Sequence, residues 1–350
     1  MQMSHQIDLR SDTVTLPPPE MRRAMYEAEL GDDVEGEDPT VNALQARAVE
    51  FSGKEDALFV SSGTQGNLVA IMTHCTRGDE IVVGDQAHIL HYEVGGASAL
   101  AGVQVRTVPN QLDGTLDPEA VVAVIRDRED VHNPFTRLIC LENTHNRCGG
   151  TVLTPAYTKQ ISDLAHANSA ALHLDGARLF NAAIALGVPA ASVAEYADSV
   201  TFCASKGLSA PVGSVLCGTH AFIGRARRWR KMLGGGMRQA GVIAAGALYA
   251  LDHMVERLAD DHQLAKLLAE GLSDIPGIDL DPSRVQTNII IFSVAPSGRD
   301  AAMVQERLAA RGVLCHAMGP VSVRYVTHYG LERADVEQAV VRTAAVMREL

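Results

Sequence analysis

The sequence predicts an α/β fold with a mostly parallel sheet covered by helices on both faces, followed by a smaller α+β unit. The first observation is that short apolar runs alternate with helical patterns through most of the chain. These strand-like runs lie at 57–60, 80–83, 104–108, 137–142, 171–175, 199–204 and 214–217. Apolar strands that alternate with helices form right-handed crossovers and a sheet that is buried on both faces.

The second observation concerns where the helices begin. Asp38, Asp117 and Thr154 each precede a proline. A side chain that caps a helix, followed by proline at the first helical position, is typical of a helix N-terminus. We therefore expect helices to start at these three places, between strands of the sheet.

The third observation is a change of pattern after about residue 240. The Ala- and Leu-rich stretch from Gly241 to Leu272 predicts one long helix that is broken near Pro276. Strands are expected at 288–294 and 321–327, with helices at 299–311 and from Arg333 onwards. A chain of 350 residues is long enough for two cores. We expect a large domain of residues 1–245 and a small α+β domain of residues 246–350.

Composition and charge exclude several classes of partner. The formal net charge of −12 argues against nucleic acid, because phosphate binding needs a basic face. The apolar stretches are too short to span a membrane, and the polar N-terminal residues predict no secretory signal. The six cysteines are scattered without a CxxC pair, which is typical of reduced thiols. We expect a cytoplasmic protein without membrane or nucleic-acid partners.

Two residues stand where predicted strands end, and ligands bind beyond the carboxyl ends of parallel strands. Asp175 closes the strand at 171–175, where a buried carboxylate needs a partner to offset several kcal/mol of desolvation. Arg178 is one candidate partner, and a helix cap is the alternative. Lys206 follows the strand at 199–204. A lysine there is either a nucleophile or one half of a salt bridge.

A third segment, 57–67, leads from a strand through Gly63 and Thr64 into a helix. The free amides at a helix N-terminus suit an anion such as phosphate. The segment has neither a Walker lysine nor GxGxxG spacing, and an ordinary turn between strand and helix is the alternative. Taken together, a phosphate cradle, a strand-end aspartate and a strand-end lysine predict pyridoxal 5'-phosphate (PLP) as cofactor.

Eight segments in order along the chain also carry a resemblance to a known family. They are IDLRSDTVT (7–15), GDDVEGEDPTVNALQ (31–45), SSGTQGN (61–67), ENTHN (142–146), HLDGAR (173–178), SKGLSAPVGS (205–214), RKMLGGGMRQAG (230–241) and VRYVTH (323–328). The chain resembles the low-specificity L-threonine aldolases nearly end to end. The resemblance implies PLP-dependent retro-aldol cleavage of L-threonine, L-allo-threonine and related β-hydroxy-α-amino acids to glycine and an aldehyde. It also implies fold type I and a homotetramer, a dimer of dimers, with active sites at a subunit interface.

The resemblance implies a role for each matching residue. Lys206 carries the cofactor as a Schiff base, Asp175 holds the pyridine nitrogen, and Gly63 and Thr64 bind the phosphate. His88 lies on the face of the cofactor ring, and His145 contacts the substrate hydroxyl. The residues that hold the substrate carboxylate are Ser11, Arg178 and Arg324. Those that approach the phosphate of the neighbouring subunit are Lys231 and Arg238.

Some questions stay open from the sequence. Either His88 or His145 can be the base for the β-hydroxyl proton. His88 and His91 are one helical turn apart, but no third ligand accompanies them, so we expect no metal. Glu35 stands where the family usually has tyrosine, which bears on substrate choice. The rival functions are another PLP reaction (β-elimination, racemisation or transamination) and a PLP-binding module without turnover.

Overall fold

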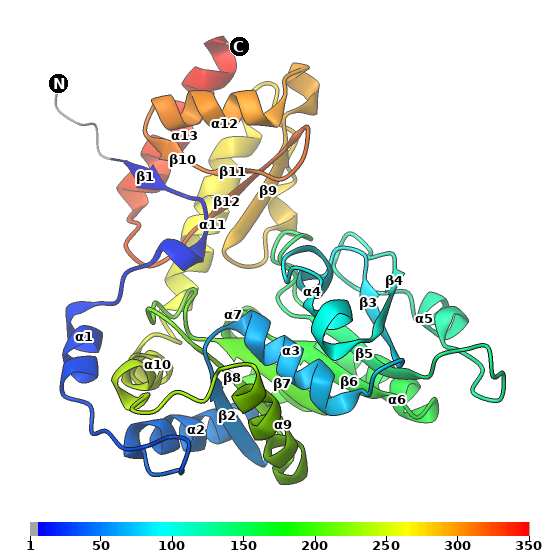
Figure 1. Cartoon of the computed structure of the whole chain (residues 1–350). Coiled ribbons are helices and arrows are strands. Elements are labelled where there is room, and N and C mark those ends of the chain that lie inside the picture. Colours follow the sequence, from blue (N-terminus) through cyan, green and yellow to red (C-terminus); the bar gives the residue numbers. More distant parts are fainter. Residues whose placement is uncertain (1–5, 350) are drawn as a thin grey trace.

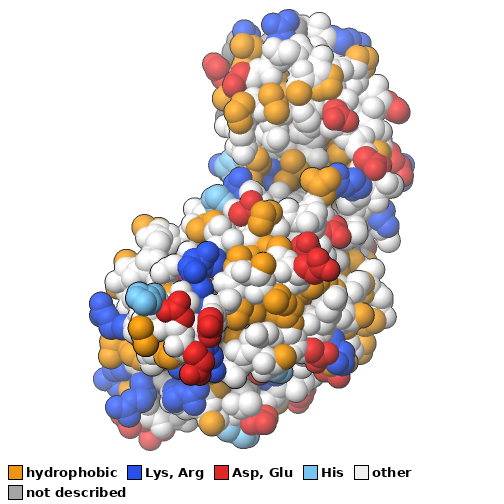
Figure 2. Space-filling model, turned by 90° about the vertical axis from the view of Figure 1, so that its right-hand side faces the viewer, with side chains coloured by type: hydrophobic (Ala, Val, Ile, Leu, Met, Phe, Trp, Pro, Cys, Tyr) orange, Lys and Arg blue, Asp and Glu red, His pale blue; other side chains and the backbone are white. Residues whose placement is uncertain are grey.

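The computed structural model describes residues 6–349 and has two lobes joined by a narrower waist (Figures 1 and 2). The polar start of the chain at 1–5, part of the expectation that no secretory signal is present, lies outside the described residues. Among the described residues, no helix is both long and apolar enough to cross a membrane.

The larger lobe is built on a seven-stranded sheet in the order β2-β8-β7-β6-β5-β3-β4. β8 runs antiparallel to both of its neighbours, and the other pairs are parallel. Every predicted strand of this sheet is present. The strands are β2 (Asp56–Val60), β3 (Glu80–Gly84), β4 (Gln104–Val108), β5 (Thr136–Glu142), β6 (Ala171–Asp175), β7 (Ser199–Cys203) and β8 (Ser214–Gly218). The prediction of a mostly parallel sheet is confirmed.

Helices cover both faces of this sheet because successive strand residues point to opposite sides. Ile139 of β5 packs on one face, whereas its neighbours Leu138 and Cys140 pack on the other. The helices on the first face are α2 (Pro39–Ser52), α5 (Pro118–Val124), α6 (Pro155–Ala167), α7 (Leu179–Leu186), α8 (Ala190–Ala194) and α10 (Gly241–His253). Those on the second are α3 (Gly63–His74), α4 (His88–His91) and α9 (His220–Met232). The helix α1 (Pro19–Tyr26) packs beside α10.

The predicted helix starts are confirmed. Asp38, Asp117 and Thr154 are the caps of α2, α5 and α6, and each side chain accepts a hydrogen bond from a backbone N–H in the first turn. Proline follows at the first helical position in all three. These caps fix where each helix leaves the sheet.

The smaller lobe lies above the large sheet in Figure 1 and has its own core. Its antiparallel sheet has the order β11-β12-β9, and the N-terminal strand β1 pairs in parallel with β10. The elements are β1 (Ile7–Asp8), β9 (Ile289–Ser293), β10 (Val313–Leu314), β11 (His316–Ala317), β12 (Ser322–Val326), α11 (Leu258–Ser273), α12 (Ala301–Ala310) and α13 (Arg333–Glu349).

The single long helix predicted from Gly241 to Leu272 is wrong. The structure has α10 up to His253 and α11 from Leu258. The break has a packing reason: Ala247 and Leu251 of α10 belong to the large core, whereas Leu268 of α11 belongs to the small core. The division predicted after residue 245 falls inside α10, and it stays a proposal. Ile7 and Leu9 pack in the small core although they begin the chain.

Candidate active site

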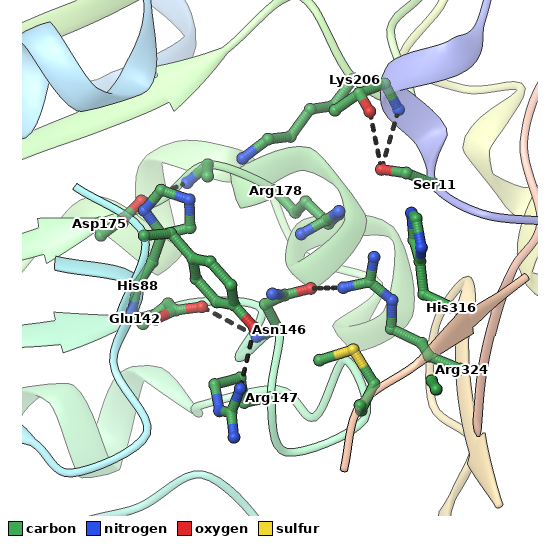
Figure 3. Close-up of a pocket in the computed structure, with 15 residues that line it drawn as sticks. Ser11, His88, Glu142, Asn146, Arg147, Asp175, Arg178, Lys206, His316 and Arg324 are labelled. Atoms are coloured by element: carbon green, nitrogen blue, oxygen red, sulfur yellow. Dashed lines mark hydrogen bonds between the residues drawn. The ribbon is translucent and has the colours of Figure 1, made fainter. Parts of the chain in front are cut away.

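A cavity of about 450 Å³ lies between the two lobes, beyond the carboxyl ends of β5, β6 and β7 (Figure 3). Its walls contain residues that are far apart in the sequence but that sequence analysis had singled out. These are Ser11, His88, Asp175, Arg178, Lys206 and Arg324. His88, Asp175, Arg178 and Lys206 end or follow strands of the large sheet, and parallel strands deliver such residues to one edge of the sheet. Ser11 comes from the N-terminal segment and Arg324 from β12 of the smaller lobe.

Lys206 reaches the cavity from the loop after β7. Its backbone carbonyl accepts hydrogen bonds from the Thr15 hydroxyl at 3.1 Å and from the Ser209 N–H at 2.8 Å. The side chain extends into the cavity in Figure 3, and its amine makes no hydrogen bond or ion pair with any residue in the range 6–349. The loop is therefore fixed while the amine stays available to react.

Asp175 is a buried carboxylate at the end of β6. Its Oδ1 accepts from the Ala177 N–H at 3.0 Å and its Oδ2 accepts from the Asn67 amide at 2.8 Å. Burial alone would raise the pKa of Asp175, but the charges of His88 and Lys206 and the Asn67 hydrogen bond together lower it. The carboxylate is therefore ionised at neutral pH and can stabilise a positive charge beside it.

His88 begins α4 and faces the cavity with a partly exposed ring. Its Nδ1 lies 2.8 Å from the buried Glu93 carboxylate, and its backbone N–H donates to Glu142 at 2.7 Å. Burial would lower the pKa of His88, but the Glu93 hydrogen bond and the charges of Asp175 and Glu93 raise it. Burial and the charge of Asp175 also raise the pKa of Glu93. Both shifts favour a proton held between His88 and Glu93.

The ligand atoms of His88, Glu93 and Asp175 lie within 4.8 Å of one another, a spacing that a metal ion could use. The Asn67 amide, however, donates to one oxygen of Glu93 and to one oxygen of Asp175, so a cation there would compete with these two hydrogen bonds. His88 and His91 do not form a pair of metal ligands, because the His91 ring bonds to the Asp85 carbonyl at 2.7 Å.

Arg178 does not pair with Asp175, so the prediction that Arg178 neutralises the strand-end carboxylate is wrong. Its partner is Asp12, which accepts from Nε at 2.7 Å and from Nη2 at 2.6 Å in a fully buried pair. Arg324 comes from β12 on the opposite side of the cavity. It donates to the Asn146 side chain at 2.8 Å and to the Arg10 carbonyl at 3.1 Å. Its Nε is buried and has no partner among the described residues.

Gly63 and Thr64 form the first turn of α3, and their amides have no backbone partner among the described residues. The Ser62 hydroxyl caps the Gln65 N–H at 3.2 Å instead. A Cβ on Gly63 would lie 2.8 Å from the Cys203 sulfur. Glycine therefore lets this helix begin close to the end of β7, three residues before Lys206. Neither Gly63 nor Thr64 lines the cavity itself.

Three other predicted residues lie away from this cavity. His145 is buried, with its backbone N–H bonded to Thr151 at 2.9 Å and its Nδ1 without a partner among the described residues. Lys231 and Arg238 are exposed. Arg238 pairs with Asp32 at 2.8 Å, and Lys231 borders a separate surface hollow together with Glu35.

Sequence reasoning missed several residues that shape the site. They are Asp12, Asn67, Glu93, Glu142 and Asn146. Asp12 adjoins Ser11, and Glu142 and Asn146 lie inside the ENTHN motif, so adjacency to chosen residues was an available signal. Asn67 carried the weakest signal, because a lone amide within a helix predicts nothing about which carboxylates the fold will place beside it.

The donor set fits PLP. A free lysine amine, a buried ionised carboxylate and unpaired helix amides are the groups that would hold its aldehyde carbon, pyridine nitrogen and phosphate. They meet at one edge of the sheet.

The sequence profile of the beta-eliminating lyase family matches residues 8–295. The chain is 48% identical over 333 residues to low-specificity L-threonine aldolase 1 of Arabidopsis thaliana, covering 94% of this chain and 93% of that protein. The chain belongs to the beta-eliminating lyase family, among the low-specificity L-threonine aldolases. Another member, the low-specificity L-threonine aldolase of Escherichia coli K12, is 46% identical over 341 residues, covering 97% of this chain and 99% of that protein.

A solved structure of threonine aldolase from Leishmania major has the same fold. It aligns with a TM-score of 0.82 at 21% identity, covering 97% of this chain and 99% of that one. The family of the chain confirms the resemblance stated from its motifs, and this structure confirms the α/β architecture.

Proposed function

We propose that this protein cleaves the Cα–Cβ bond of L-threonine, L-allo-threonine and related β-hydroxy-α-amino acids to give glycine and an aldehyde, with PLP as cofactor. One observation carries the proposal. The Lys206 amine, which has no partner among the described residues, extends into a cavity whose walls hold the Asp175 carboxylate and three arginines, among them Arg178 and Arg324. This chemistry needs an amine that binds the cofactor, an anion beside the pyridine nitrogen, and cationic groups that hold the substrate carboxylate.

When bound, PLP acts as an electron sink for the substrate Cα. Lys206 would hold the cofactor covalently and release it to the substrate amine. Asp175 would stabilise the protonated pyridine nitrogen, which its lowered pKa supports. The free amides of Gly63 and Thr64 would bind the phosphate, and His88 would lie against the ring.

The substrate carboxylate would bind between Arg324, Arg178 and Ser11. The buried Nε of Arg324 has no partner in the described part of the chain, and a carboxylate oxygen would satisfy this donor. Because Asp12 already occupies Nε and one edge of Arg178, we assign the larger share of binding to Arg324. Fixing the carboxylate also fixes the direction of the Cα–Cβ bond, and orientation is a large part of catalysis.

We assign to His88 the role of the base that accepts the β-hydroxyl proton. It lines the cavity, Glu93 holds its Nδ1, and its Nε2 has no partner among the described residues. His145 remains the alternative base. It does not line this cavity.

We further propose a cytoplasmic homotetramer in which Lys231 and Arg238 approach the phosphate site of a neighbouring subunit. Both side chains are exposed and lie away from the cavity of their own chain. Exposed apolar side chains such as Tyr26 (90% exposed) and Val94 (97%) favour contact with other copies. Glu35 borders the same hollow as Lys231 and would then approach the neighbouring site as well.

The decisive experiment is incubation of the PLP-loaded protein with L-threonine and, separately, with L-serine, followed by product identification. We expect glycine and acetaldehyde from L-threonine. Formation of 2-oxobutanoate with ammonia would indicate β-elimination, and D-allo-threonine, the product of inversion at Cα alone, would indicate racemisation. No turnover of either amino acid would indicate a binding module. Each of these three results would contradict the proposal.

A further inference from the structure

A chain of hydrogen bonds, buried except at its His74 end, runs behind Asp175 and away from the cavity. His74 bonds to the Ser199 hydroxyl at 2.8 Å, and Ser199 bonds to the Nδ1 of His173 at 2.8 Å. The Nε2 of His173 bonds to the Asn67 side-chain oxygen at 3.1 Å. The Asn67 amide nitrogen then donates to Asp175 and to Glu93, both at 2.8 Å.

The secondary structure places these groups in one line. Asn67 and His74 lie two turns apart on α3, so they face the same side of the helix. His173 precedes Asp175 by two residues on β6 and therefore points to the same face of the sheet. Ser199 is the strand partner of His173 on β7.

Only one direction of donation satisfies every group. Burial lowers the pKa of His173 to about 4 and that of His74 to about 3, so each ring is neutral and carries a single N–H at neutral pH. The ionised Asp175 can only accept, so the Asn67 amide nitrogen must face it. The Asn67 oxygen must then accept from the N–H of His173.

The orientation of Asn67 determines the donor and acceptor in each remaining hydrogen bond. The Nδ1 of His173 accepts from the Ser199 hydroxyl, which has one hydrogen and must accept in turn from His74. If Asn67 were turned over, its oxygen would face two carboxylates and both would lose a donor. The carboxylates therefore set the orientation of Asn67, and the hydrogen bond from His173, backed by Ser199 and His74, holds it there.

We propose that Asn67 is a positioning residue that links the carboxylate for the pyridine nitrogen, Asp175, to the His88–Glu93 pair, and that His173, Ser199 and His74 hold it in that orientation. This inference rests on the proposed function. A single amide supplies one hydrogen to each of two buried carboxylates and keeps them apart. Without it, the two carboxylates would share a site, where like charges favour protonation of one of them.

The test compares three substitutions of residues in this hydrogen-bond series, made in the PLP-loaded protein: Asn67→Asp, His173→Phe and Ser199→Ala. The readouts are the visible absorption band of lysine-bound PLP, the PLP dissociation constant, and kcat and KM for L-threonine. Asn67→Asp keeps the shape but removes both donors and adds a third carboxylate. Loss of a buried hydrogen bond to a charged group predicts a change of about tenfold to a hundredfold in PLP affinity and in kcat.

The inference makes three graded expectations. The effect falls from Asn67→Asp to His173→Phe to Ser199→Ala, the absorption band shifts in the first two, and KM changes much less than kcat because Asn67 does not contact the arginine clamp. His173→Gln should restore most of the loss, since its amide can donate to Asn67 as the ring does. Thr73→Val is the matched control. Thr73 is buried on the same helix, and among the described residues its hydroxyl bonds only to the Val69 carbonyl, so this variant should match the parent protein.

The possible results distinguish a failure of the role inferred for Asn67 from a failure of the proposed function. Unchanged PLP affinity and absorption in Asn67→Asp and His173→Phe would overturn the inference. Equal losses in Thr73→Val would also overturn it, because the effect would then be general destabilisation. If His173→Phe fails to fold, the comparison of His173→Gln with Ser199→Ala decides. Graded PLP effects in a protein that does not cleave L-threonine would support the inference while contradicting the proposed function.

Discussion

Arg178 and Asp12 form a fully buried bidentate ion pair that joins the large sheet to the N-terminal segment, with N···O distances of 2.7 and 2.6 Å. Asn288 of the small lobe also donates to Asp12 at 3.3 Å. The pair therefore ties three distant parts of the chain together at the wall of the cavity. It also neutralises Arg178, one of three arginines in the cavity wall, and leaves the charge of Arg324, which bonds to the neutral Asn146 side chain, for a substrate.

Asp12→Ala should lower the free energy of unfolding by about 3–5 kcal/mol, because removing one partner leaves a buried charge uncompensated. Urea denaturation of the PLP-free protein measures this. Glu349→Ala, which removes an exposed partner of Arg311, is the control and should cost about 0–1 kcal/mol. Equal losses in the two variants would contradict a stabilising role for the buried pair.

The same pair predicts a pH dependence with a definite sign. Burial alone would raise the pKa of Asp12, but Arg178 holds it well below its usual range. A carboxyl with a lowered folded-state pKa stabilises the protein above its unfolded pKa of about 3.9 and loses that stabilisation as the pH falls further. The stability difference between the parent protein and Asp12→Asn should be constant near neutral pH and shrink below about pH 4. A difference that grew on acidification would have the wrong sign.

The sequence predicted the large sheet well because its strands are buried on both faces and are bounded by caps and turns. It failed at the break between α10 and α11, since Ala- and Leu-rich helices look alike whichever core they bury against. The residues that carry chemistry, Lys206 and Asp175, were found because each follows an apolar strand. Asp12 and Asn67 were missed because their importance comes from partners that only the fold brings near.

Arg324→Ala should leave the PLP absorption band intact and reduce kcat/KM for L-threonine by roughly 30- to several-thousand-fold, as expected for loss of a partly desolvated charged contact. If the arginine also orients the Cα–Cβ bond, kcat should fall too. Arg324→Lys keeps the positive charge but loses the planar guanidinium group, which can donate two parallel hydrogen bonds to a carboxylate. It should therefore recover only part of the loss. Steady-state kinetics at saturating PLP measure these effects, and an unchanged kcat/KM would remove Arg324 from the site.

Asp175→Ala should weaken PLP retention and lower turnover by several orders of magnitude, because an unprotonated pyridine ring is a poor electron sink. Dialysis followed by absorbance measures retention, and product assays at saturating PLP measure turnover. Asp163→Ala, on an exposed face of α6, is the control and should behave like the parent protein. Near-normal turnover of Asp175→Ala would contradict the electronic role.

His88→Phe and His145→Asn separate the two candidate bases. Phenylalanine keeps a ring at position 88 but cannot accept a proton, so kcat should fall by roughly 10²–10⁴-fold. The raised pKa of His88 predicts that the parent protein loses activity as the pH falls through a value above 6.5, and His88→Phe should lack that limb. His145→Asn should keep the limb and lose much less activity. The reverse pattern would make His145 the base.

The most direct test of the account is borohydride reduction of the PLP-loaded protein, followed by peptide mapping. We expect the reduced cofactor on Lys206, whose amine lies in the cavity without a partner between residues 6 and 349, and we expect Lys206→Ala to fold without any covalently fixed PLP. The parent protein should also show the visible absorption band of lysine-bound PLP, and the variant should lose it. Recovery of the cofactor on a different lysine, or on none, would contradict the assignment of this cavity as the active site.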